Sequence, residues 1–439
     1  MYNLNPMQNN NHTTVSFHTI GCRLNQYETA VLRNSFENKG FSIVSSDAPA
    51  DIVVINTCTV TEKSDTDTRQ YINKMIRRNA AVKIALVGCQ VQLQKDVLKQ
   101  LPHVHWVIGN KRKFDLPSII KDSDHPMILV PAMGKPESFK METFGIDTEH
   151  TRANLKIQDG CDNFCTYCEV PFARGRARSR EFDDIVKEAH VLAEAGHKEI
   201  ILTGINVGKY QDKKRTIVDV VKVLEGVPKL KRIRISSIEP TNILDSLIDY
   251  MAKKTKLCRY LHIPIQHGND AILKLMARKY NVEQVKDLIL KAHETIPDIC
   301  IGTDIIVGFP GETDSQFEET YKLLKQIPVN YFHVFSFSKR NMAKAKEYAG
   351  QVSISEIQQR SAKLRGLGQR KRRQFYEQMI GKKVSVLFEQ AKEGQWQGLT
   401  DNFIQVHVSS IKDLNNQIHL VQLKHVHGQA IHGQLIEKD

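Results

Sequence analysis

Three cysteines in the middle of the chain have a spacing that suits an iron–sulfur cluster. Cys161, Cys165 and Cys168 form a CxxxCxxC motif within residues 160–168. Thiolates are the ligands of such clusters, and a 4Fe-4S cluster held by three cysteines leaves one iron open to a small molecule. The alternative is zinc, but zinc prefers four ligands, usually in two paired elements, and no second pair lies nearby in the sequence. The motif therefore predicts that these three residues are metal ligands and form the catalytic centre.

Three further cysteines are far apart in the sequence but have similar surroundings. Cys22, Cys58 and Cys89 each follow a short apolar run that is typical of a buried strand. The carboxyl ends of parallel strands meet at one edge of a sheet, so these residues can converge there. A single cysteine is more often a small buried apolar residue. Their repeated placement favours a second three-cysteine cluster with Cys22, Cys58 and Cys89 as its metal ligands.

The remaining two cysteines, Cys258 and Cys300, have no partners at metal-ligand spacing. Both lie in apolar surroundings near the start of expected strands. We interpret both as residues of the hydrophobic core.

The elements that must position Cys22, Cys58 and Cys89 are an alternation of strands and helices. The first segment has strand-like runs that are separated by helical patterns, at residues 15–20, 52–55, 84–87 and 106–108. This order is typical of an α/β domain with a doubly wound parallel sheet. Glycine, proline and serine then mark a linker over residues 131–138, and we expect a boundary near residue 140.

The alternation resumes beyond the linker. Strands are expected at residues 155–157, 200–203, 233–236, 261–265, 301–307 and 332–337, followed by a basic helix over 354–379. Six such units make a partial (βα)6 barrel, whose chemistry is expected in the loops after the strands. In the last segment Ile404, Val406 and Val408 alternate with polar residues, which predicts a small all-β domain. The predicted domains span residues 13–130, 147–377 and 379–439.

Composition and charge narrow the class of protein. The chain is 41% hydrophobic and 25% charged, and no apolar run approaches the roughly 18 residues of a membrane span. Residues 1–12 are polar and rich in asparagine, so we expect no secretory signal and a cytoplasmic location, without membrane association. The net charge of +13 favours a polyanionic partner such as nucleic acid.

The motifs together resemble one enzyme family. CxxxCxxC after the first strand of a βα barrel is the signature of the radical S-adenosylmethionine (SAM) superfamily, and this sequence is similar to its methylthiotransferase branch. The segments that carry the resemblance are residues 19–28, 56–61 and 87–89 in the first domain and 234–240, 261–266 and 303–312 in the barrel. The last domain resembles the TRAM RNA-binding module, which is OB-like. Two segments depart from the family pattern: residues 267–270 read His-Gly-Asn-Asp in place of Ser-Gly-Ser-Asp, and residues 338–343 lack Gly-Thr-Pro after the arginine.

The resemblance implies a reaction and its cofactors. Residues 26–28 and 56–61 look most like the MtaB group, which converts N6-threonylcarbamoyladenosine at position 37 of transfer RNA (tRNA) to its 2-methylthio derivative. The family uses SAM and two 4Fe-4S clusters. The cluster at Cys161 generates a 5'-deoxyadenosyl radical from SAM, and the auxiliary cluster supplies the methylthio group. The implied partners are the anticodon loop of tRNA and an electron donor such as flavodoxin or ferredoxin.

Position in the barrel suggests further SAM-binding residues. Gly204, Ser237, Glu239, Gln266 and Gly308 lie at or after the ends of expected strands, where they can contact the nucleotide or the methionine. Turn formation, capping and solvation are the ordinary alternatives for these residue types.

RNA contacts are expected from basic and aromatic residues. The basic run over residues 174–180 contains four arginines and follows the cysteine loop, where it could meet the anticodon phosphates. Its alternative is a solvated basic face. A second basic group precedes the β domain, in which two aromatic residues could stack on bases or belong to the core; these residues are Lys371, Arg372, Arg373, Trp396 and Phe403.

Two classes of alternative function stay open. The same chemistry could act on an isopentenylated adenosine in tRNA or on a ribosomal protein. A protein of another class, a non-catalytic iron–sulfur RNA-binding protein, would not cleave SAM.

Overall fold

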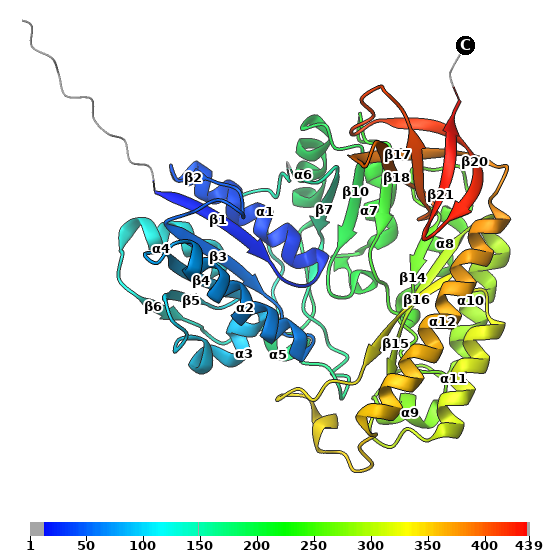
Figure 1. Cartoon of the computed structure of the whole chain (residues 1–439), viewed down its shortest axis with the longest axis horizontal. Helices are drawn as coiled ribbons and strands as arrows, with labels where there is room; N and C mark the ends of the chain where they lie inside the picture. The colour runs from blue at the N-terminus through cyan, green and yellow to red at the C-terminus, as the bar shows by residue number, and fades with distance from the viewer. Residues whose placement is uncertain (1–12, 148, 437–439) are drawn as a thin grey trace, which may run out of the picture. The chain divides into compact units, whose positions relative to one another are not determined.

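The computed structural model describes residues 13–147 and 149–436 of the chain. The expectation about a secretory signal concerns residues 1–12 and lies outside this part. The described chain forms two compact units. The first extends to Gly134 and includes Glu142–Gly145 and Phe172–Arg174, and the second contains the remaining residues. Figure 1 follows both units from blue to red along the chain.

The first unit is built on a six-stranded sheet in which all strand pairs are parallel. The strand order is β2-β1-β3-β4-β5-β6. Its elements are β1 (Thr14–Thr19), α1 (Arg23–Asn38), β2 (Ser42–Ile43), β3 (Ile52–Thr57), α2 (Glu62–Arg78), β4 (Lys83–Gly88), α3 (Cys89–Leu98), β5 (Val104–Ile108), α4 (Leu116–Asp122) and β6 (Met127–Leu129).

Helices cover both faces of this sheet. Val53 and Ile55 pack in one apolar cluster with Ile72 of α2, and the alternate residues of β3 pack in a second cluster with residues of α1 and α4. Because both faces of the central strands are buried, their sequences are continuous apolar runs. The predicted doubly wound parallel sheet is confirmed. The edge strands β2 and β6 were not predicted, since they are too short to give a periodic signal.

The second unit contains two three-stranded parallel sheets, β13-β10-β7 and β14-β15-β16. Isolated bridges between Ser237 and His262 and between Ile233 and Leu257 link β13 to β14 and to the residues before it, which gives the partial barrel that the sequence predicts. The elements up to β13 are β7 (Arg152–Lys156), β8 (Gln158–Asp159), α5 (Val170–Arg174), β9 (Arg178–Ser179), α6 (Phe182–Glu194), β10 (Glu199–Thr203), β11 (Gln211–Asp212), β12 (Arg215–Thr216), α7 (Ile217–Glu225) and β13 (Arg232–Ile235). Of α5, only Val170 and Pro171 belong to this unit. The later ones are α8 (Asp245–Met251), β14 (Tyr260–His262), α9 (Asp270–Leu275), α10 (Val282–Thr295), β15 (Cys300–Val307), α11 (Asp314–Gln326), β16 (Tyr331–Ser336) and α12 (Ile354–Gln378).

One barrel strand is shorter than predicted. β14 ends at His262, whereas the apolar run continues to Ile265. Proline has no N–H for a strand ladder, and the Tyr280 hydroxyl is the partner of the Pro264 and Ile265 carbonyls, at 2.9 Å from each. These backbone groups are therefore satisfied outside the sheet.

The chain ends in a small closed barrel with the order β17-β18-β19-β21-β20. Its strands are β17 (Lys383–Lys392), β18 (Gln395–Thr400), β19 (Gln405–Ser409), β20 (Ile418–His427) and β21 (Ala430–Leu435). Val406 and Val408 are buried in its core, as their alternation predicts. The five-stranded closed barrel agrees with the expected OB-like TRAM module.

Buried arginines join this small barrel to the amino ends of the central strands. Arg232 donates to the Leu399 carbonyl at 2.8 Å, and Arg234 donates to the Thr400 carbonyl at 3.0 Å. Glu199 balances their charge, at 2.7 Å from Arg234. Among the described residues, no helix has the length and apolarity that a membrane crossing requires.

Candidate active site

The CxxxCxxC loop connects β8 to α5, at the carboxyl end of the first barrel strand. Gly160 has a φ of 71°, and a Cβ there would lie 2.1 Å from the Arg176 carbonyl oxygen, so only glycine fits. The backbone and hydroxyl of Thr166 donate to the Met276 and Leu275 carbonyls at 3.1 and 2.8 Å. These contacts fix the loop against the end of α9.

The three thiols of this loop are close enough to influence one another. Burial, together with the neighbouring Cys165 and Cys161, raises the pKa of Cys168 to about 12. Burial also raises the pKa of Cys161, with a further contribution from Cys165. Buried thiols that disfavour each other's ionisation need a bound cation to become thiolates together. The donor set therefore fits an iron–sulfur cluster.

Arg278 lies beside these thiols and was not singled out from the sequence. Its guanidinium donates to the Cys165 sulfur at 3.2 Å and to the Tyr167 hydroxyl at 3.1 Å. It also forms an ion pair with Glu239. Burial raises the pKa of Glu239, and Arg278 opposes that shift. A single arginine after an amphipathic helix carries no signal in the sequence, so only the fold shows this contact.

The residues predicted to bind SAM all lie at the carboxyl ends of barrel strands. Gly204 directly follows β10, Ser237 and Glu239 follow β13, Gln266 follows β14, and Gly308 directly follows β15. Ser237 is exposed, while Glu239 is held by Arg278. The fold brings these five residues to one edge of the barrel, and their contact with SAM stays a prediction.

Local packing accounts for two of the glycines. A Cβ on Gly204 would lie 3.0 Å from the Gln158 carbonyl oxygen. Gly308 has a φ of 76°, and its N–H donates to Glu312 at 2.6 Å. Close packing against Gln158 therefore explains Gly204, and the turn interpretation explains Gly308, without a ligand.

The second set of cysteines lies at one edge of the first unit's sheet. Cys22 precedes α1, Cys58 follows β3, and Cys89 begins α3. A Cβ on Gly21 would lie 2.7 Å from the Cys58 sulfur, which shows how closely these two turns approach. Burial raises the pKa of Cys58 to about 11, with further contributions from Cys89 and Cys22. The structure brings the three predicted residues into one group.

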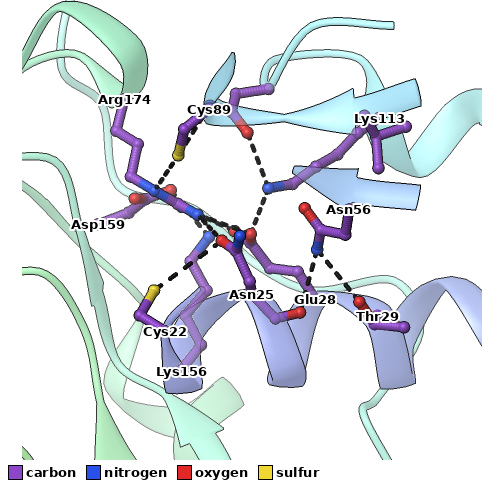
Figure 2. A network of polar contacts seen from close by, with 12 residues as sticks. Cys22, Asn25, Glu28, Thr29, Asn56, Cys89, Lys113, Lys156, Asp159 and Arg174 are labelled. Atoms are coloured by element: carbon purple, nitrogen blue, oxygen red, sulfur yellow. Dashed lines mark hydrogen bonds and ion pairs between the residues drawn. The ribbon is translucent and has the colours of Figure 1, made fainter. Parts of the chain in front are cut away.

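A buried charge network supports this group (Figure 2). Arg174 donates to the Cys89 sulfur at 3.1 Å, to Asn25 at 2.7 Å and to Glu28 at 2.9 Å. Lys113 forms a second ion pair with Glu28. Burial raises the pKa of Cys22, and the neighbouring Arg174 opposes that rise. The residues of this network were not identified as a group from the sequence.

The expectation that residues 174–180 contact RNA phosphates is wrong for two of the four arginines. Arg174 is 1% exposed and paired with Glu28, and Arg180 is fully buried between Asp184 and Glu188. Arg178 pairs with Asp159 at 3.1 Å. Arg176 remains exposed, at 4.9 Å from the Phe164 ring centre. Asp184 follows Arg180 by four residues, so the sequence contains that pairing, whereas Glu28 is too distant from Arg174 for the sequence to indicate the contact.

Several other residues considered in the sequence take part in packing or hydrogen bonding within the second unit. Cys258 and Cys300 are both buried in the second unit, as expected of core residues. Phe403 stacks on Tyr260 with ring centres 4.4 Å apart, so it belongs to the core. Lys371 donates to the Ile327 carbonyl at 2.8 Å.

Two known protein families match separate parts of the chain. Residues 155–324 match the radical SAM superfamily, and residues 14–109 match the family described as uncharacterized protein family UPF0004. The radical SAM match implies a 4Fe-4S cluster and SAM, which agrees with the three thiols of the CxxxCxxC loop.

A solved structure of low sequence identity has a related fold. The radical SAM methyltransferase TsrM from Kitasatospora setae, with cobalamin and a [4Fe-4S] cluster bound, aligns with a TM-score of 0.56 at 14% identity. The alignment covers 76% of this chain and 77% of that one. This likeness concerns the fold alone.

Curated relatives are similar over most of the chain. The threonylcarbamoyladenosine tRNA methylthiotransferase MtaB of Bacillus subtilis is 36% identical over 93% of this chain and 93% of its own length. The MtaB of Aquifex aeolicus is 34% identical over 93% of this chain and 99% of its own. A tRNA-2-methylthio-N(6)-dimethylallyladenosine synthase of Thermodesulfovibrio yellowstonii is 35% identical over 76% of this chain and 78% of its own. The chain belongs to the radical SAM methylthiotransferase family.

Proposed function

We propose that this protein methylthiolates carbon 2 of N6-threonylcarbamoyladenosine at position 37 of tRNA. The observation that carries the proposal is the pair of three-cysteine groups, Cys161, Cys165 and Cys168 in the barrel and Cys22, Cys58 and Cys89 in the first unit, each at the carboxyl edge of a parallel sheet. A 4Fe-4S cluster on three thiolates keeps an open iron. Two such clusters suit a reaction with separate steps of hydrogen abstraction and sulfur delivery.

The first group would hold the SAM-cleaving cluster, and the second group an auxiliary cluster. When bound, these cofactors supply a radical able to act on an unactivated C–H bond and a methylthio group. Arg278 keeps a cation beside Cys165, and Arg174 does the same for Cys89. Gly204, Ser237, Glu239, Gln266 and Gly308 lie at the barrel edge where SAM would bind.

The choice of substrate rests on the relatives and on charge. Relatives named for threonylcarbamoyladenosine match at 33–36% identity over most of this chain. The net charge of +13 suits a polyanionic tRNA. We propose a cytoplasmic location and an electron donor such as flavodoxin or ferredoxin as part of the same function. The domain limits 13–130, 147–377 and 379–439 belong to this proposal.

The second candidate substrate is an isopentenylated adenosine. It is favoured by relatives named for dimethylallyladenosine, which reach 35% identity. The chemistry at the two three-cysteine groups is the same for both substrates, so these groups do not distinguish them.

A competition experiment separates the two candidates. Reconstituted protein with SAM and a reductant is given equal amounts of tRNA carrying threonylcarbamoyladenosine and tRNA carrying isopentenyladenosine, and the nucleosides are measured by mass spectrometry. We expect methylthiolation of the threonylcarbamoyl substrate alone. Methylthiolation of the isopentenyl substrate alone would contradict this proposal and support the second candidate substrate.

A further inference from the structure

The interior face of β14, β15 and β16 carries a polar group outside the two cysteine sites. Side chains alternate between the faces of a strand. Leu261, Ile301 and Ile305 face the helices and pack with residues of α10 and α11. The alternate residues line the opposite face, which in a βα barrel is the interior. Those with a ring or a carboxylate are Tyr260, His262, Asp304, Tyr331, His333 and Phe335.

Three of these side chains form one cluster. His262 Nε2 lies 2.9 Å from Asp304 Oδ1, and His333 Nδ1 lies 3.1 Å from the same oxygen. Although burial favours protonation, the two imidazoles hold the pKa of Asp304 below its ordinary value. Both rings donate to one carboxylate oxygen, so the cluster is satisfied without a metal ion.

The cluster has a fixed end and an open end. The Tyr260 and Tyr331 hydroxyls are 2.6 Å apart, and the Tyr331 hydroxyl lies 3.3 Å from His262 Nδ1. The His262 side chain is only 5% exposed, whereas that of His333 is 55% exposed. Phe335 is 40% exposed, with its ring centre 6.3 Å from that of His333. A ligand can therefore reach His333 and Phe335.

The position of the cluster connects it with the barrel's catalytic edge. Asp304 precedes Ile306 by two residues on the same strand face, and Ile306 packs in an apolar cluster that includes Tyr167 of the cysteine loop. Two residues along a strand correspond to about 7 Å. The histidine–aspartate cluster thus lies two residues along β15 from the apolar cluster that packs against Tyr167 of the CxxxCxxC loop.

We propose that His262, Asp304 and His333 bind the amino-acid substituent on N6 of the substrate adenine, with its carboxylate at His333 and the base stacked on Phe335. This inference rests on the proposed function and extends it to substrate selection. Carbon 2 and the N6 substituent flank N1 on the same edge of adenine, so fixing the substituent also orients carbon 2. An apolar isopentenyl group would offer no acceptor to the exposed side of the His333 ring, whereas a carboxylate would, so the site would favour the amino-acid substituent.

The test compares two substrates that differ only in the carboxylate. The first is tRNA carrying threonylcarbamoyladenosine, and the second carries its methyl ester, which is neutral. A hydrogen bond to a charged group predicts that the wild-type enzyme prefers the carboxylate by about 10-fold to 100-fold in kcat/KM. His333→Phe keeps an aromatic ring without nitrogen donors and should bring this ratio close to one. The matched control is His293→Phe on the exposed side of α10, which should keep the wild-type ratio.

The outcomes separate the two proposals. A wild-type ratio near one, or an unchanged ratio in His333→Phe, would overturn the substituent site while leaving the proposed function intact. A wild-type enzyme that methylthiolates neither substrate but accepts isopentenyladenosine would overturn the proposed function itself. Iron content and Tm verify the folding of His333→Phe, and His333→Leu, which also lacks a donor, gives the same comparison if that variant is unstable.

Discussion

At the scale of single residues, the sequence indicated the cysteines of the two groups but not the charged residues beside them. Cysteine spacing and strand context predicted both three-cysteine groups, and the fold brings each group together, while metal binding by them stays a prediction. Arg278 and Arg174 were not assigned to these groups, since a buried arginine and an exposed one have the same local sequence pattern. The carboxylates that bury Arg174 and Arg180 follow from the fold, and for Arg174 the partner, Glu28, lies far away in the chain.

The first residue-scale prediction concerns the two cysteine groups. Cys161→Ala should abolish production of 5'-deoxyadenosine, because it removes a ligand of the SAM-cleaving cluster. Cys58→Ala should retain that production but stop formation of the methylthio product. Mass spectrometry of small molecules and nucleosides from one reaction measures both quantities. Retained 5'-deoxyadenosine production in Cys161→Ala would contradict the ligand assignment, and Cys300→Ala serves as a buried cysteine control.

The second residue-scale prediction concerns Arg278. Arg278→Met leaves Glu239 as a buried carboxylate without its cation, and removing one partner of a buried pair typically costs about 3–5 kcal/mol. We expect a lower Tm and less iron per chain, because Cys165 also loses its cationic neighbour. Iron analysis and calorimetry measure these effects. The double variant Arg278→Met with Glu239→Gln should recover much of the stability, and no recovery would contradict the pairing.

At the scale of elements, the long apolar strands were predicted well, whereas the polar contacts at strand ends and between the two barrels were not. The central strands of the first sheet match the predicted runs because both of their faces are buried. β14 was predicted too long, because a run of apolar residues does not show that the Tyr280 hydroxyl is the partner of the Pro264 and Ile265 carbonyls. The joint between the partial barrel and the small β barrel consists of charged residues that a hydropathy pattern assigns to the surface, such as Arg234 and Glu199.

The element-scale prediction concerns that joint. Arg234, with Arg152 and Arg232, lowers the pKa of Glu199 to about 2 from an ordinary value of 4.5, although burial alone would raise it. Glu199→Gln should therefore destabilise the protein by about 3–5 kcal/mol at neutral pH. A carboxylate with a lowered pKa contributes its full stabilisation above about 4.5 and loses it as the pH falls toward 2.

Chemical denaturation across this pH range tests the linkage. The difference in unfolding free energy between wild type and Glu199→Gln should shrink steadily below pH 4.5. Glu194→Gln, whose side chain is 62% exposed, is the control and should change stability little. A difference that is independent of pH would contradict the role of the charge.

At the scale of the whole molecule, the order of domains could be predicted because each has its own periodicity. Alternating strands and helices give way to alternating apolar and polar residues after α12, and the closed barrel begins there. The net charge indicated a polyanionic partner but not the surface that binds it, since charge is summed over the chain.

The whole-molecule prediction concerns salt. If tRNA binds through phosphate contacts, its Kd should rise steeply with salt concentration, with a slope of roughly 0.7 to 0.9 per contact on a logarithmic scale. Arg365 and Arg373 are exposed on α12, and replacing both by alanine should reduce the slope by about one to two. Binding titrations at several salt concentrations measure it, with Lys253→Ala as the control. An unchanged slope would show that Arg365 and Arg373 of α12 do not contact tRNA phosphates.

The most direct test of the proposed reaction is mass spectrometry of nucleosides from total tRNA, compared between cells that have the gene and cells that lack it. We predict that 2-methylthio-N6-threonylcarbamoyladenosine disappears without the gene while N6-threonylcarbamoyladenosine accumulates, and that the wild-type gene restores the product whereas Cys161→Ala does not. Unchanged levels of both nucleosides in cells that lack the gene would contradict the account.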